Sequence, residues 1–306
     1  MTAQGGTGQG PLGNDTPARR LRHALEGALV WLLVRLCRLL SVDAASALGG
    51  ALARGIGPRL ALTRRAARHY ARAFPQADEP EVAAAMRAMW DNLGRTAFEY
   101  PNLTRIDCYR GSRVSVTGAE HIDRLRDDGR PGIFFSGHIA NWEIMPLAVA
   151  QRGCDISLVY RAANNPHVDQ MILKARGAIT HTHVPKGAVG ARQMVKIIRD
   201  GGHLGMLVDQ KLNAGIAVPF FGQPAMTAPA IAQLALKYDL PLVPCAVRRT
   251  HGAHFAVTIH PPLAHPDTGD RERDVYALMV EINKFIEETI RANPPHWMWL
   301  HRRWKD

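Results

Sequence analysis

The sequence predicts an α/β fold with a mainly parallel central sheet flanked by helices, preceded by a helical N-terminal membrane-associated region. From about residue 111 onward, short runs rich in β-branched residues alternate with helical stretches. Such alternation is typical of parallel sheets whose strands are connected by covering helices. Before that point, apolar residues recur at helical spacing. A chain of 306 residues is long enough to bury a large core in this fold.

We divide the chain into three regions. Residues 1–17 are rich in Gly, Thr, Gln and Pro and are predicted to be disordered. Residues 18–110 form the helical membrane-associated region, and residues 111–306 form the α/β region that carries the candidate site. No internal repeat is visible.

The helical region begins with a basic cluster at 19–22 and an apolar segment at 24–42. Arg35 and Arg38 interrupt this segment near its end, whereas a spanning helix needs roughly 20 mostly apolar residues. A helix lying in the membrane interface therefore competes with a spanning one. The segment is also compatible with a buried core helix, or with a cleaved signal peptide that has the small residues 44–47 at its cleavage site.

More helices follow this segment, at 44–53, 60–73 and 79–100. The second of them carries Arg64, Arg65, Arg68 and Arg72 near one side. These cations are either a solvated face or a patch for anionic headgroups.

The strands and helices of the α/β region alternate along the chain. Strands are predicted at 113–116, 132–135, 156–160, 182–184, 203–208, 242–248 and 254–260. Helices are predicted at 119–125, 141–151, 165–176, 189–199, 228–238 and 271–291. Ligands of such sheets bind at the carboxyl ends of the strands. Both His138 and Asp209 follow a predicted strand directly.

The composition restricts the partners. A net charge of +11 favours anionic lipid headgroups, an acidic protein or nucleic acid. Nucleic acid is disfavoured because zinc-finger spacing, basic-aromatic strand signatures and a long basic tail are missing from the sequence. The four cysteines are far apart, so no metal or redox motif is expected, and two of them lie in apolar segments typical of small buried residues. The sequence also contains no P-loop, no G-x-S-x-G elbow and no convincing dinucleotide fingerprint.

His138 and Glu143 are the predicted catalytic pair. The apolar run 132–135 ends in a short loop that presents His138, and Glu143 follows as a helix begins. An imidazole can take a proton from a hydroxyl while a carboxylate holds the ring and stabilises its charged form. The spacing alone is weak, because His265/Asp270 and His301/Asp306 share it. A histidine in a helix-capping region beside a surface glutamate is the plainer interpretation.

Substrate-binding residues are predicted around this pair. Arg161 follows the strand at 156–160 and is well placed to hold a phosphate; Arg176 ends the next helix. Asp209 ends a buried strand, where it either contacts the cationic partners or a substrate hydroxyl, or caps a helix. Asn141 is a plausible helix cap beside the pair and is included with the substrate-binding residues.

Two further segments are open to two interpretations. The loop at 218–222 either covers the core or forms a wall of an acyl-chain tunnel. The stretch at 295–305 holds three tryptophans and several cations. It is either an aromatic belt at a membrane interface or a C-terminal helix packed on the core.

These motifs, in this order, resemble those of the bacterial lipid A late acyltransferases, the lauroyl and myristoyl acyltransferases. The resemblance covers nearly all of the chain after residue 18. The matched pieces are Gly137-His138 with Asn141-Trp142-Glu143, Tyr160-Arg161 with Asn164 and Pro166, Asp209-Gln210, Val218-Pro219-Phe220-Phe221-Gly222 with Ala225 and Thr227, and Trp299-Leu300-His301-Arg302-Arg303.

The resemblance implies an enzyme at the cytoplasmic face of the inner membrane. It implies transfer of a fatty acyl group from an acyl carrier protein or coenzyme A thioester to a hydroxyl of a lipid A precursor. His138 and Glu143 would act as the general-base dyad, with no cofactor beyond the acyl thioester co-substrate and no metal. Acyl carrier protein, the phosphates of the acceptor and anionic lipids are all partners that a basic protein attracts.

Two different functions stay open at this point. One is that of an acyltransferase for another membrane lipid, such as a glycerophospholipid, a glycolipid or an amino-acid lipid. Enzymes of the glycerol phosphate type carry an aspartate in the H-x4 motif and a Pro-Glu-Gly loop, which this sequence lacks. The second is that of a non-catalytic, basic membrane-binding scaffold.

Overall fold

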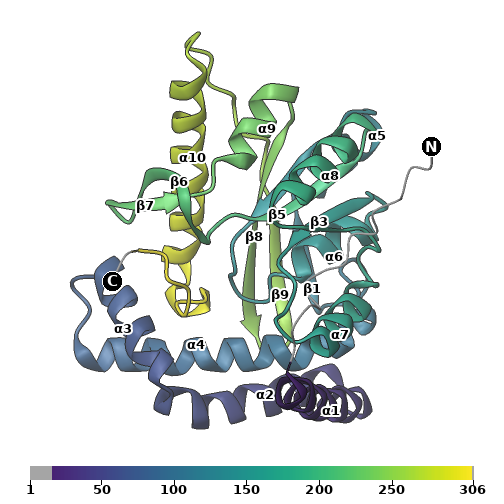
Figure 1. Ribbon diagram of the computed structural model, residues 1–306, viewed down its shortest axis with the longest axis vertical. Helices are drawn as coiled ribbons and strands as arrows, with labels where there is room; N and C mark the ends of the chain where they lie inside the picture. Colours follow the sequence, from purple (N-terminus) through teal and green to yellow (C-terminus); the bar gives the residue numbers. More distant parts are fainter. Residues whose placement is uncertain (1–15, 305–306) are drawn as a thin grey trace.

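A computed structural model describes residues 16–304 of the protein. The predicted disorder at residues 1–17 lies outside them except for Thr16 and Pro17, which begin the first helix. A mainly parallel sheet with the strand order β1-β9-β8-β2-β5-β3-β4 occupies the centre (Figure 1). Its strands are β1 (Val114–Thr117), β2 (Ile133–Ser136), β3 (Ile156–Tyr160), β4 (His183–Pro185), β5 (His203–Leu207), β8 (Leu242–His251) and β9 (His254–Ile259). Within this sheet β8 and β9 pair in antiparallel fashion and the other neighbours are parallel. The predicted α/β class is confirmed.

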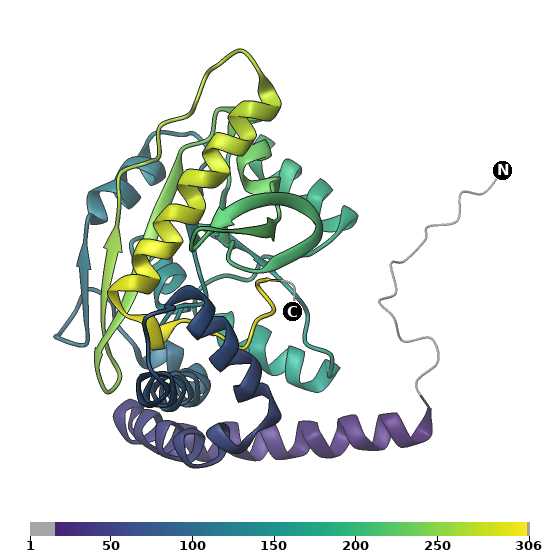
Figure 2. The same ribbon diagram turned by 90° about the vertical axis from the view of Figure 1, so that its left-hand side faces the viewer.

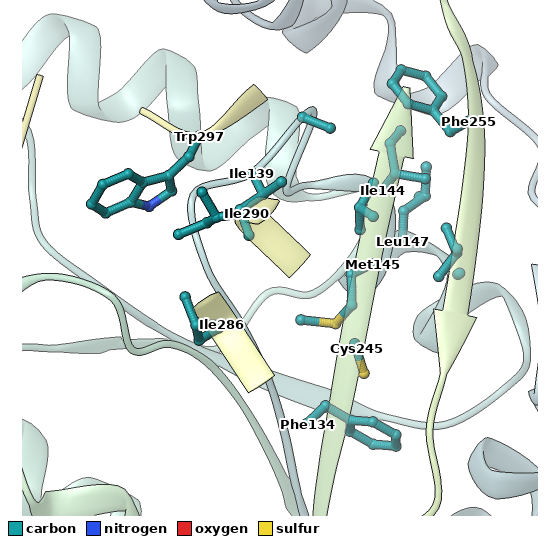
Figure 3. Close-up of a cluster of buried hydrophobic side chains, with 14 of the residues drawn as sticks. Phe134, Ile139, Ile144, Met145, Leu147, Cys245, Phe255, Ile286, Ile290 and Trp297 are labelled. Atoms are coloured by element: carbon teal, nitrogen blue, oxygen red, sulfur yellow. The ribbon is translucent and has the colours of Figure 1, made fainter. Parts of the chain in front are cut away.

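The helices of the α/β region cover both faces of this sheet. They are α5 (Ala119–Asp127), α6 (Ile144–Gln151), α7 (Pro166–Arg176), α8 (Ala188–Arg199), α9 (Ala230–Tyr238) and α10 (Arg271–Ala292). The alternation of β2 shows how the two layers form. Phe134 belongs to the same buried cluster as α6, whereas Ile133 and Phe135 belong to a second cluster with α8, α9 and α10. Figure 3 shows the first cluster, where Phe134 lies near Met145 and Cys245.

The first helices form a layer across one end of the sheet (Figures 1 and 2). They are α1 (Pro17–Leu39), α2 (Val42–Ile56), α3 (Ala61–Ala73) and α4 (Glu79–Glu99), with short 3-10 helices at η1 (Gly57–Arg59) and η2 (Tyr100–Arg105). The α2 and α4 backbones approach closely at Gly49 and Gly94. A Cβ at Gly94 would lie 2.2 Å from the carbonyl oxygen of Gly49. Glycine at these two positions therefore allows the helices to pack backbone to backbone.

The apolar side of α1 faces outward. Sixteen large apolar side chains are exposed in residues 16–304, and thirteen of them lie between Leu21 and Leu62. Eight of these are on α1, three on α2 and two at the start of α3. Within the described residues, no helix combines the length and the apolar character needed to cross a bilayer.

A hairpin replaces the predicted loop at 218–222. The strands β6 (Lys211–Phe220) and β7 (Gln223–Thr227) pair in antiparallel fashion around a turn at Phe221 and Gly222. Both turn residues have positive φ, 51° and 69°. Phe220 and Phe221 are buried, so the hairpin covers the core.

The C-terminal tryptophans are core residues, so the predicted packing on the core is confirmed, although without a helix, and the aromatic belt is wrong. Trp297, Trp299 and Trp304 are at most 1 % exposed. After η3 (Pro294–His296) the chain packs on the core in an irregular conformation within the described residues. Figure 3 shows Trp297 beside Ile139 and near Ile286 and Ile290 of α10. All four cysteines are buried, as the sequence predicted for two of them.

Candidate active site

His138 lies at the carboxyl end of β2, in the loop that leads to α6. Its neighbour Gly137 brings the backbone close to Asp209, because a Cβ there would lie 3.3 Å from Oδ2 of Asp209. The C-terminal segment holds the loop from the other side. The amide of Met298 donates to the carbonyl of His138 (3.0 Å), and the amide of Ala140 donates to the carbonyl of His296 (2.9 Å). The loop is therefore fixed by a strand end and by a strand-like pairing with residues 296–298.

Asp209 is the carboxylate that holds His138. It follows β5, the strand beside β2, and its side chain is fully buried while that of His138 is 14 % exposed. Oδ1 lies 2.8 Å from Nδ1 of His138, and Oδ2 accepts from the backbone amide of His138 (2.8 Å) and from the indole of Trp297 (2.7 Å). Burial raises the pKa of Asp209, but attraction to the protonated form of His138 and the hydrogen bonds from His138 outweigh this effect and lower the pKa below its ordinary value. Asp209 is therefore an ionised acceptor.

The opposite ring nitrogen of His138 acts as an acceptor. The ammonium of Lys186 can only donate, and it donates to Oε1 of Gln210 over 2.8 Å. This contact turns the amide nitrogen of Gln210 toward Nε2 of His138 (3.4 Å) and Nε2 of His301 (3.2 Å). Because an amide nitrogen only donates, Nε2 of His138 carries the lone pair and Nδ1 carries the proton that Asp209 accepts. This tautomer is the one that a general base requires.

The predicted contact between His138 and Glu143 does not form. Glu143 is only 1 % exposed and makes a bidentate ion pair with Arg176, with distances of 2.9 and 2.6 Å. It also accepts a short hydrogen bond from the hydroxyl of Tyr100. The chain passes through the left-handed residue Ala140 (φ 52°) between the two side chains, and α6 starts at Ile144 rather than at Asn141. The carboxylate of Glu143 consequently meets α7 and η2 rather than the imidazole.

Burial keeps Tyr100 protonated at this second cluster. Burial raises the pKa of Tyr100 well above its ordinary value, and the charge of Glu143 raises it further. The hydroxyl therefore remains a donor to Glu143. Burial lowers the pKa of Arg176, but Glu143 outweighs it, so the guanidinium stays charged. Glu143, Arg176 and Tyr100 thus form a closed cluster that joins the start of α6 to the end of α7.

The structure distributes the predicted substrate-binding residues unevenly. Asp209 is engaged by His138 and Trp297, and Arg176 by Glu143. Asn141 is fully buried, donates to Glu99 (2.8 Å) and accepts from the amide of Glu143 (3.2 Å). Arg161 is exposed and makes no hydrogen bond or ion pair with the part of the chain that the structure describes. It is the predicted residue that stays available to a ligand.

His301 and Trp142 complete the surroundings of His138. Their rings make edge-on contacts with the imidazole, with centroid distances of 4.9 and 5.1 Å. Burial and the nearby His138 lower the pKa of His301 to about 4, so its ring is neutral near pH 7. The sequence analysis includes Gln210 and His301 in the matched motifs without a role at the site, and it does not include Lys186. The signal for Lys186 was its place at the end of β4, the same edge of the sheet on which His138, Asp209 and Arg161 lie.

An apolar cavity of about 600 Å³ lies beside this cluster. Helices α1, α4 and α7 form its walls, and Trp142, which packs on His138, lines it too. Cations stand among the apolar side chains, namely Arg35, Arg38 and Lys174. A volume of this size is typical of a site for a small ligand. The hairpin at 218–222, which the sequence offered as a tunnel wall, does not line this cavity.

In residues 16–304, no three His, Cys, Asp or Glu side chains are grouped so that they could hold a metal ion. The fold and the site define a class: an α/β protein with a buried aspartate–histidine pair at the carboxyl edge of its sheet, able to accept a proton from a hydroxyl. The chain belongs to the bacterial lipid A biosynthesis acyltransferase family, whose model matches residues 14–306. The resemblance that the sequence motifs indicated is confirmed.

Two curated relatives are similar to part of the chain. The lipid A biosynthesis lauroyltransferase of Escherichia coli (strain K12) is 26 % identical over 196 residues, which cover 63 % of this chain and 62 % of the relative. The lipid A biosynthesis acyltransferase of Haemophilus influenzae is 26 % identical over 193 residues, covering 61 % and 60 %. The match thus spans about three fifths of the length of these relatives.

One solved structure has a distant similarity to the chain. It is the crystal structure of the 1-acyl-sn-glycerophosphate acyltransferase from Thermotoga maritima, with a TM-score of 0.38 and 13 % identity. The superposition covers 93 % of this chain and all of that one. A similarity this low does not bear on activity.

Proposed function

We propose that the protein is an O-acyltransferase that moves a fatty acyl chain from an acyl thioester to a hydroxyl of a lipid A precursor, with His138 as general base and Asp209 as the residue that orients it. The observation that carries this proposal is the geometry of Asp209. It accepts from Nδ1 of His138 and leaves the Nε2 lone pair directed at Gln210. Family membership supplies the substrate class.

The proposed reaction has two proton transfers and one bond exchange. Nε2 of His138 takes the proton of the acceptor hydroxyl as its oxygen attacks the thioester carbonyl. The C–O ester bond forms, the C–S bond breaks, and the imidazolium returns its proton to the departing thiolate. Asp209 stabilises the imidazolium in between, which is the role of the carboxylate in a general-base pair. Gln210 gives up its contact with Nε2 when the hydroxyl arrives.

The other residues support binding in this proposal. The cavity between α1, α4 and α7 accommodates the acyl chain, because its apolar walls reach Trp142 and hence the base. Arg161 and Lys186 end neighbouring parallel strands and attract the phosphate of the acceptor. The net charge of +11 attracts an acidic acyl carrier protein or coenzyme A as donor. Glu143 acts through Arg176, as an anchor of α7.

The test compares His138→Gln with His265→Gln. His265 belongs to one of the rival His-x4-acid pairs and lies beside Asp239, where it is half-buried. Membranes or detergent-solubilised protein receive an acyl thioester and a lipid A precursor, and mass spectrometry measures the acylated product. We expect His138→Gln to abolish transfer and His265→Gln to retain it. Equal activity of His138→Gln and the wild type would refute the proposal. Transfer of the acyl group to another membrane lipid instead would support His138 as the base but refute the lipid A precursor as the acceptor.

We further propose that α1 and α2 lie in the interface of the inner membrane on its cytoplasmic side. The exposed leucines of α1 form an apolar face, and α1 also carries five exposed arginines: Arg19, Arg20, Arg22, Arg35 and Arg38. Apolar faces bordered by cations are typical of helices that lie in the headgroup region of anionic membranes. Such a position would set the mouth of the acyl-chain cavity, which α1 lines, at the lipid surface.

Vesicle sedimentation tests this position. The wild type should bind phosphatidylglycerol vesicles and bind phosphatidylcholine vesicles less. The double variant Leu29→Glu/Leu36→Glu should lose binding, because it places two charges on the apolar face of α1. Val189→Glu is the matched control, since Val189 is comparably exposed but lies on α8. Binding that the α1 variant leaves unchanged would exclude α1 as the contact.

A further inference from the structure

Ala140, two residues after His138, has a backbone conformation that needs support. Its φ of 52° lies in the left-handed region, which costs free energy for any residue with a Cβ. Such residues persist where the surroundings hold them in place, and they cluster at functional sites. Ala140 is fully buried, so protein groups alone must provide this support.

Two side chains of α4 hold the carbonyl of Ala140. The amide of Asn92 donates to it over 3.2 Å, and the hydroxyl of Thr96 donates over 3.1 Å. The next residue is held as well, because Asn141 donates to Oε2 of Glu99 over 2.8 Å. Asn92 and Thr96 of α4 therefore hold the backbone between His138 and Glu143, and Glu99 of the same helix holds the side chain of Asn141.

A buried ion pair orients all three of these groups. Arg249, near the end of β8, is 6 % exposed and pairs with Glu99, which is fully buried. The same guanidinium donates to Oδ1 of Asn92 (2.9 Å) and to Oγ1 of Thr96 (3.2 Å). A guanidinium only donates, so it turns the amide nitrogen of Asn92 and the hydroxyl hydrogen of Thr96 toward Ala140. The donors that the loop requires are thus set by Arg249.

We infer that Glu99 and Arg249 are positioning residues for catalysis, because they hold the left-handed turn at Ala140 and so place Nε2 of His138. This inference rests on the proposed acyl transfer. Neither residue contacts His138 or Asp209 in the described part of the chain. They act through Asn92, Thr96 and the loop. A displacement of about 1 Å of a catalytic group can reduce the rate about 10²-fold, so a loop that relaxes has a large effect on turnover.

Asn92→Ala and Ser46→Ala form the decisive pair of variants. Ser46 on α2 donates to Oε1 of Glu99 over 2.7 Å, so Ser46→Ala removes a bond from the same buried cluster without touching the loop. We expect Asn92→Ala to lower kcat about 10²-fold at unchanged KM for both substrates. Ser46→Ala should lower the melting temperature and keep kcat. If kcat per folded molecule stays at the wild-type value in Asn92→Ala, the inference is wrong.

Ala140→Gly provides a rescue that a purely structural role does not predict. Glycine adopts positive φ without a Cβ penalty, so the loop then depends less on its clamp. The loss of kcat caused by Asn92→Ala should shrink at least several-fold in the Asn92→Ala/Ala140→Gly double variant. Equal losses in both backgrounds would contradict the inference.

Nuclear magnetic resonance separates this inference from the proposed function. The proton on Nδ1 of His138, bonded to Asp209, should give a downfield signal that Asn92→Ala shifts or broadens and Ser46→Ala leaves in place. An unshifted signal in Asn92→Ala refutes the positioning role, whether or not acyl transfer is observed. Absence of acyl transfer by the wild type refutes the proposed function instead.

Discussion

Replacing Asp209 with asparagine should reverse the tautomer of His138. The two oxygens of Asp209 receive three donors, one at Oδ1 and two at Oδ2. An asparagine must therefore place its side-chain oxygen at the position of Oδ2, because the amide of His138 and the indole of Trp297 both donate there. Its NH2 group then faces Nδ1, which has to accept, and the ring proton moves to Nε2. The atom that should receive the hydroxyl proton is no longer a base.

The loss of activity should be about 10⁴-fold in kcat, the size seen when an asparagine sets the wrong tautomer of a catalytic histidine. Four decades of rate correspond to about 5 kcal/mol of activation free energy. The assay is acyl transfer from a thioester to a lipid A precursor, with folding checked by circular dichroism. Asp274→Asn is the matched control. Asp274 lies in the first turn of α10, is also buried, and accepts a hydrogen bond from the hydroxyl of Thr268. A folded Asp209→Asn protein that loses less than about tenfold would refute the assigned tautomer.

Three other predictions concern stability. Burial and the nearby His138 lower the pKa of His301 from 6.5 to about 4. Between these pH values the unfolded chain binds a proton at His301 that the folded protein does not, so the free energy of unfolding falls as the pH is lowered through this range. In melting curves, His301→Gln should remove on the order of 3 kcal/mol of this pH dependence. Glu143→Gln leaves the buried charge of Arg176 unpaired and should lower the free energy of unfolding by about 3–5 kcal/mol. The melting temperature should fall accordingly, and the double variant Glu143→Gln/Arg176→Met should restore part of it. Gly94→Ala should destabilise the protein by about 1–3 kcal/mol, because the added methyl group meets the α2 backbone. Gly55→Ala has open space around it and should stabilise the protein. If chemical denaturation ranked the two variants in the reverse order, the packing of α2 on α4 would be contradicted.

The sequence predicted the edge of the sheet at which the site lies but not the partners within it. His138 and Asp209 each follow a buried strand, and both were expected at carboxyl strand ends. Their contact depends on β2 and β5 being neighbours, which the order of strands along the chain does not reveal. The spacing of five residues and the family motif predict Glu143 as the partner of His138, but the left-handed turn at Ala140 separates its carboxylate from the imidazole.

Two more differences also have local causes. The sequence predicted a loop at 218–222 but not the strands β6 and β7 that flank it, and the turn places Phe221 at positive φ, a conformation that bulky residues rarely adopt. The tryptophans after Pro295 looked like membrane residues because cations surround them. Two of the three indoles donate inside the protein instead, Trp297 to Asp209 and Trp299 to the carbonyl of Pro294, whereas Nε1 of Trp304 is buried without a hydrogen-bond partner among the described residues. Composition alone does not distinguish a belt from a core.

The pairing of residues 296–298 with the loop at His138 has a consequence for biosynthesis. Asp209 and His138 are made long before Trp297, yet the carboxylate obtains its third donor, and the loop its backbone partners, only from that segment. On the ribosome, a nascent chain that already contains both residues still lacks a finished site. The proposed base gains these contacts only after residues 296–298 have left the exit tunnel and docked, so the proposed acyl transfer depends on a segment made about 160 residues after His138.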